Sequence, residues 1–124
     1  MIEEKHYKGI NFNSQLMEDT EFESCKFTSC SFSDVNLSHV IFLECEFENC
    51  DLSMAKLGNT AFGEVSFNNC KMLGLHFENC NPFLFSVSFN NCQLNLSSFY
   101  QMALKGTKFL DCSIQEVDFT AVDL

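Results

Sequence analysis

The sequence has no tryptophan, one proline and five glycines among 124 residues, and its seven basic residues are far fewer than its seventeen acids. No stretch approaches the roughly 20 consecutive apolar residues of a membrane-spanning helix. The first residues, MIEEKHYKGINF, lack the apolar core of a secretory signal peptide. These absences predict a single cytoplasmic domain that is not inserted in a membrane.

The charge balance excludes one class of partner. The formal net charge is −10 at pH 7, and so acidic a surface repels the phosphates of DNA and RNA. We therefore expect no direct binding of nucleic acid, and a protein partner whose own surface is basic.

Eight cysteines raise the question of a disulfide scaffold or a zinc site. Cytoplasmic thiols stay reduced, and the closest cysteines, such as Cys25 and Cys30, are five residues apart with no histidine spaced to complete a zinc site. The sequence also contains no phosphate-binding loop and no GxSxG motif. We therefore expect neither enzymatic activity nor a metal or cofactor.

Phenylalanine is abundant, with fifteen residues, and it recurs every five positions. From Phe22 to Phe77 every fifth residue is large and apolar, and the residue two before it is small or β-branched except at Leu75. Residues two apart on an extended backbone point to the same side, so both should face inward. The phenylalanines expected in the core are Phe22, Phe27, Phe32, Phe42, Phe47, Phe62, Phe67, Phe77, Phe89, Phe99, Phe109 and Phe119.

The register of the repeat changes within NPFLFS, residues 81–86. The next good series after Phe77 begins at Leu84, a step of seven, which indicates an insertion of two residues. The segment SFNNC supports this reading, because it occurs at 66–70 and again at 88–92, an offset of 22. With Leu84 inward, Phe83 and Phe85 should point outward, where they either form a docking spot or fold over the kink.

A period of five with two inward positions predicts a solenoid in which no coil has a core alone. The segments CKFTS (25–29), CEFEN (45–49) and CDLSM (50–54) carry a small residue, a polar residue and then Leu or Phe, and in this the chain resembles the pentapeptide-repeat family. The resemblance implies an all-β fold, a right-handed quadrilateral β-helix with four repeats per coil and about six coils.

One boundary within the chain follows from this pattern. Residues 1–19 fit the repeat poorly, so we expect an N-terminal cap there and the β-helix over residues 20–124. The chain stops at Leu124, a repeat centre, and unpaired strand edges at the end of a solenoid invite association. We expect either a C-terminally incomplete domain or a homodimer formed through this end.

With twenty residues per coil, the acidic residues fall on two adjoining faces. Those around the column of Phe22, Phe42 and Phe62 are Glu21, Glu23, Glu44 and Glu64, while Glu46 and Glu48 flank Phe47 on the next face. Two alternatives stay open: a solvated surface that keeps the rod soluble, or a negative stripe that attracts a basic groove. On an outer column, Asn49 and Asn69 are expected to form a hydrogen-bonded ladder.

Within the family, the segments 50–62, 73–80 and 81–99 look most like bacterial proteins that protect DNA gyrase, namely the plasmid quinolone-resistance and microcin-immunity proteins. That resemblance implies an acidic DNA mimic that binds DNA gyrase or another type II topoisomerase and gives resistance to quinolones or microcin. The residues at stake would be the acidic faces and the loop at the break. The alternative hypothesis is a structural scaffold module with a different protein partner, docking at Phe83 and Phe85.

Overall fold

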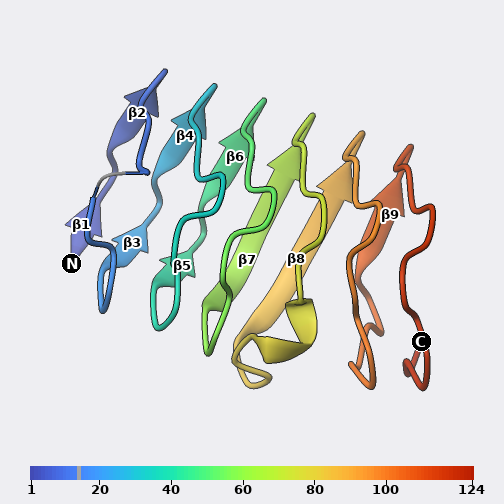
Figure 1. Ribbon diagram of the computed structural model, residues 1–124. Helices are drawn as coiled ribbons and strands as arrows, with labels where there is room; N and C mark the ends of the chain where they lie inside the picture. Colours follow the sequence, from blue (N-terminus) through green and yellow to red (C-terminus); the bar gives the residue numbers. More distant parts are fainter. Residues whose placement is uncertain (14) are drawn as a thin grey trace.

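The computed structural model describes residues 1–13 and 15–124, which form a rod of short parallel strands with the chain ends at opposite ends of the rod (Figure 1). The strands are β1 (Ile2–Glu3), β2 (His6–Lys8), β3 (Glu21–Glu23), β4 (Lys26–Thr28), β5 (Ile41–Leu43), β6 (Glu46–Glu48), β7 (Ala61–Asn68), β8 (Phe85–Asn90) and β9 (Lys108–Leu110). A 3-10 helix, η1, covers Phe77–Asn79. The described residues contain no helix of the length and apolarity needed to cross a membrane.

The strands pair in parallel with partners one coil further along the chain. In the first half of the rod the offset is twenty residues, as in the series Phe22, Phe42 and Phe62, whose members stand opposite one another. Because the repeat is five residues long, twenty residues make four repeats and give each coil four sides. The quadrilateral β-helix implied by the resemblance to the pentapeptide-repeat family is thereby confirmed.

The four faces are of two kinds. The first face consists of β1, β3, β5 and the start of β7, and the second consists of β2, β4, β6 and the end of β7. The third and fourth faces carry isolated bridges instead of strands, such as Ser31 with Asp51 and Asn36 with Lys56. Their corners are closed by turns in which a repeat centre accepts a hydrogen bond from the amide three residues later, as from Val35 to Phe32 at 3.0 Å.

The core consists of aromatic columns that run along the rod. Within a column the rings stack nearly parallel, as for Phe27 and Phe47 with centroids 4.8 Å apart, and between columns they meet edge to face, as for Phe42 and Phe47 at 5.2 Å. Offset stacks and edge contacts are the favoured arrangements of aromatic rings. Ten of the twelve phenylalanines expected in the core are buried: Phe22, Phe27, Phe32, Phe42, Phe47, Phe62, Phe67, Phe77, Phe89 and Phe99.

The other two, Phe109 and Phe119, are half-buried. They stack on Phe89 and Phe99 with centroids 5.2 and 5.5 Å apart, so their inward direction is as expected. They differ from the other ten because no described coil covers the far side of the last coil. Ile114 of the same coil is 46% exposed.

Residues 1–13, which lie within the stretch 1–19 expected to be an N-terminal cap, form a coil of the same helix. Ile2 pairs with Phe22 and Tyr7 with Phe27. Phe12 is buried and stacks on Phe32 with centroids 4.6 Å apart. The inward residues here are therefore continuous with the repeat columns, although the sequence around them departs from the repeat.

The change of register shows as an irregular pairing of β7 with β8. Ser66 pairs with Ser88 and Phe67 with Phe89, which confirms the offset of 22 residues. Phe62, however, pairs with Phe85, an offset of 23, so a bulge separates the two halves of the ladder. The net insertion of two residues is therefore three residues added before Phe85 and one removed between Phe85 and Phe89.

Candidate partner-binding surface

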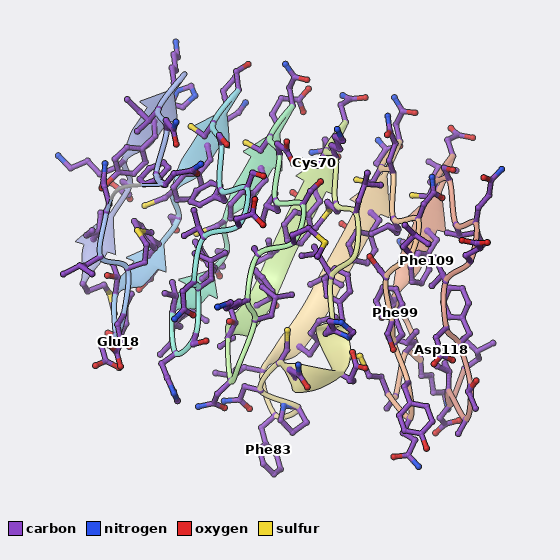
Figure 2. All side chains as sticks on the ribbon, viewed as in Figure 1. Glu18, Cys70, Phe83, Phe99, Phe109 and Asp118 are labelled. Carbon is purple, nitrogen blue, oxygen red and sulfur yellow. The ribbon has the colours of Figure 1, made fainter. Side chains whose placement is uncertain are left out.

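Acidic side chains line the first face and its two corners in the N-terminal half of the rod. Glu21 and Glu23 flank Phe22 on β3 and are half-buried, whereas Glu44 and Glu64 stand exposed at the following corner. We call the whole set the acidic strip, which comprises Glu3, Glu4, Glu18, Asp19, Glu21, Glu23, Glu44 and Glu64. Figure 2 labels Glu18 near the edge of the rod.

The corner that carries Glu44 and Glu64 has a fixed backbone conformation. Both residues have positive φ, 51° and 53°, and the amide of Glu44 donates to the carbonyl oxygen of Gly63 in the next coil at 2.7 Å. The hydroxyl of Ser24 in the preceding coil donates to Glu44 Oε2 at 3.4 Å. The corner therefore presents these carboxylates as a column with one residue per coil.

The acids of the second face are in a different electrostatic setting. Glu46 Oε1 lies 3.7 Å from Lys26 Nζ, and Glu48 Oε1 accepts a hydrogen bond from Asn69 Nδ2 at 2.9 Å. Both Glu46 and Glu48 are half-buried on β6. A cation beside Glu46 offsets part of the negative potential there, so the first face is the more strongly acidic of the two.

The ladder expected between Asn49 and Asn69 is wrong for this pair, because each side-chain amide donates to another residue. Asn49 Nδ2 donates to Ser29 Oγ at 3.2 Å, and Asn91 Nδ2 donates to Asn69 Oδ1 at 2.5 Å. Asn69 itself reaches Glu48 instead of Asn49. The column is thus hydrogen-bonded from Ser29 to Asn49 and from Asn69 to Asn91, while Asn69 contacts Glu48 of β6 in place of Asn49.

The first face also carries apolar residues that the search for acids did not single out. Ile41 and Leu43 on β5 occupy the positions that Glu21 and Glu23 hold one coil earlier. A Cβ added to Gly63, the next residue in this column, would lie 2.7 Å from Leu43 Cδ2. The sequence could have indicated this apolar part of the face, because Ile41 and Leu43 stand at outward positions of the repeat.

At the break, two of the predicted side-chain directions are wrong. Leu84 is 41% exposed instead of inward, and Phe85 is half-buried, with its ring edge-on to Phe77 at 6.1 Å. The larger apolar side chain takes the place in the wall, because eight residues from Phe77 to Phe85 allow the chain to loop out first. Phe83 is 92% exposed, as expected, and Figure 2 shows it pointing away from the rod.

The cysteines and histidines contact neighbouring residues of the rod. Seven cysteines are buried, Cys112 is half-buried, and all eight are free thiols. His6 contacts the Thr28 hydroxyl at 2.9 Å, His39 contacts Asn59 at 3.3 Å, and His76 contacts Glu78 at 3.5 Å. Among the described residues, no three or more His, Cys, Asp or Glu side chains are grouped so that they could hold a metal ion.

These features define a solenoid protein with a regular charged surface. The family models agree with the geometry: the model described as pentapeptide repeat region matches residues 40–119, and the one described as pentapeptide repeats (8 copies) matches residues 8–42. The chain belongs to the pentapeptide-repeat family.

Two solved structures of other proteins are similar to this chain. A structure of trypsin-treated QnrB1 (M102R), described as a plasmid-mediated fluoroquinolone resistance protein, is 20% identical, with a TM-score of 0.49 over 99% of this chain and 72% of that one. The pentapeptide repeat protein Rfr23 from the cyanobacterium Cyanothece 51142 is 10% identical, with a TM-score of 0.40 over 98% of this chain and 86% of that one. No curated protein matches the sequence.

Proposed function

We propose that this protein acts without catalysis, through protein–protein contact, and that its acidic strip binds a basic protein groove as an imitation of B-DNA. The partner we propose is DNA gyrase or another type II topoisomerase, which the protein would protect from a quinolone or a microcin. The observation that carries this proposal is the concentration of carboxylates on one face of a rigid rod, including the exposed corner residues Glu44 and Glu64.

The density of charge is of the right order for such imitation. Coils of a β-solenoid are about 4.8 Å apart. The eight acids of the strip lie on four coils, four on the first, two on the second and one on each of the next two, which averages two per coil. That is about one negative charge per 2.4 Å of axis, compared with about one per 1.7 Å in duplex DNA. A groove lined with Lys and Arg would therefore meet a comparable, somewhat weaker field.

The test is a DNA supercoiling assay with gyrase and a fluoroquinolone, with and without this protein, at two salt concentrations. We expect protection or inhibition that weakens at the higher salt, because screening reduces the attraction between exposed charges. Folded protein that has no effect, or an effect that salt does not change, would count against the DNA-mimic proposal.

The second candidate function is a structural scaffold module with another protein partner. Phe83, at 92% exposure, and its exposed neighbour Leu84 favour it, since adjoining apolar side chains in solvent can mark a contact site. Phe85, which the sequence placed in the docking surface together with Phe83, is not part of it, because its ring packs against Phe77. Loss of a pull-down partner in Phe83→Ser, with the partner retained after charge reversal of the strip, would favour the scaffold.

The assembly and location that we propose rest on further features. The last coil leaves Ile114 46% and Leu124 83% exposed, which supports a homodimer formed through the C-terminal end. Sedimentation of the protein and of Ile114→Glu would test this, because a buried glutamate would split the dimer. The eight free thiols favour the reducing cytoplasm.

A further inference from the structure

The register break creates a cavity on the wall of the rod. It has a volume of about 460 Å³ and is lined by residues of two successive coils, among them Glu78, Pro82, Phe85, Tyr100 and Met102. Ligand sites in proteins commonly have volumes of about 300–1,000 Å³. The cavity is therefore large enough for a small organic group.

The cavity arises where one aromatic column is interrupted. Phe42 and Phe62 stack with parallel rings 5.5 Å apart. The next member of the column, Phe85, instead turns its edge to Phe77. The inserted residues carry the chain away from the wall before Phe85, so the packing of the regular coils does not continue there.

A carboxylate oxygen without a partner lies at this cavity. Glu78 Oε1 is buried from solvent and has no hydrogen-bond partner among the described residues, while Oε2 lies 3.5 Å from His76 Nδ1. Burial, and secondarily the negative charge of Glu78, raises the pKa of the neighbouring Cys80 thiol. A buried acceptor left unpaired is costly, so a donor supplied by a ligand would be favoured at this place.

The remaining walls suit a flat cation on an apolar stem. Phe85 and Tyr100 contribute aromatic rings and Met102 a polarisable thioether. A guanidinium stacks on aromatic faces more readily than an ammonium does, and its fixed fork of N–H groups matches a carboxylate. An anionic ligand would instead be repelled by Glu78.

We propose that this cavity is a binding site for an alkyl guanidinium group, which pairs with the carboxylate of Glu78 and lays its plane against Phe85 or Tyr100. The group would belong either to an arginine side chain of a protein or to a free guanidine compound. None of the residues that line the cavity belongs to the acidic strip, and the proposal goes beyond the function proposed above.

The experiment is a titration of the isotope-labelled protein with Nα-acetyl-L-arginine amide, followed by backbone amide NMR shifts. We expect saturable shifts confined to residues around Glu78, Phe85 and Tyr100. Glu78→Gln should weaken binding about tenfold or more. Tyr100→Ala should weaken it severalfold, and this substitution replaces an exposed side chain. The matched control, Glu64→Gln at an exposed corner, should bind as the unchanged protein does.

Two further ligands complete the test. Nα-acetyl-L-lysine amide should bind more weakly, and equal binding would overturn the assignment to guanidinium. A capped peptide with a central arginine should bind at least as well as the amino-acid probe if the natural source is a protein, and more weakly if it is a free compound. Absence of shifts at the cavity, or shifts unchanged in both Glu78→Gln and Tyr100→Ala, would overturn the proposal.

Discussion

The hydroxyl of Thr60 donates a hydrogen bond of 2.7 Å to the carbonyl oxygen of Leu37, 23 residues earlier, and both residues are buried. Cysteines at the same repeat position do likewise: the thiol of Cys50 reaches the carbonyl of Phe27 at 3.2 Å. Across the break the separation becomes 25 residues, from Cys92 to Phe67. Where the small inward residue is threonine or cysteine, as at Thr60, Cys50 and Cys92, it is thus also a donor that ties a coil to the one before it.

Replacing Thr60 with valine should lower the free energy of unfolding by about 1 kcal/mol, the net value of a typical hydrogen bond. Valine keeps the shape of threonine and removes the hydroxyl. Chemical denaturation with urea would measure the change, and Thr60→Ser, which retains the donor, shows what loss of the methyl group costs. Equal stability of the valine variant and the unchanged protein would contradict this role of the hydroxyl.

Phe47→Ala should destabilise the protein by about 3–5 kcal/mol, because a large cavity would replace a ring in the middle of a column. Phe47 is fully buried and stacks between Phe27 and Phe67 with centroids 4.8 and 5.0 Å away. The comparison variant is Phe83→Ala, at the most exposed phenylalanine, where urea denaturation should show little change. A small loss for Phe47→Ala would contradict the aromatic column as the main source of stability.

Charge reversal tests the acidic strip directly. Glu44→Lys with Glu64→Lys should weaken binding to gyrase about tenfold or more at low salt, because both carboxylates would change from attracting to repelling a basic groove. The matched control is Asp34→Lys with Glu116→Lys, which changes the net charge equally at two corner residues that also have positive φ, 61° and 56°. Binding of each double variant to immobilised gyrase would be measured. Equal weakening by the two double variants would show that net charge, and not the acidic strip, determines binding.

Alkaline pH should destabilise the protein through its buried thiols. Burial raises the pKa of Cys45 to about 11, so the unfolded chain loses this proton at a lower pH than the folded protein does. The contribution of the protonated Cys45 thiol to the free energy of unfolding is therefore complete below the ordinary pKa of a thiol. It declines as the pH rises from there towards 11. Urea denaturation at neutral and alkaline pH would measure the decline, and Cys45→Val should reduce it. If stability declines with pH equally in Cys45→Val and in the unchanged protein, Cys45 is not a source of the decline.

Much of the fold could be predicted, because the repeat is short and its two inward positions are chemically distinct. The burial of Phe22, Phe47 and Phe77 follows from the period alone, and the segment SFNNC located the change of register. The exchange of Leu84 and Phe85 could not be found in this way. A net insertion of two residues is compatible with several local paths, and packing of the Phe85 ring against Phe77 selects one of them.

The candidate sites depended still more on the third dimension. The acids of the strip are visible in the sequence, but only the structure pairs Glu46 with Lys26 and leaves the first face the more acidic. Nothing in the sequence singled out Glu78, since the lack of a hydrogen-bond partner for its carboxylate oxygen depends on the residues that surround it in the fold. The sequence by itself determined a solenoid with an aromatic core, because periodicity dictates which residues face inward. Tertiary structure decided where that regularity fails, because the cavity at the break depends on contacts between coils.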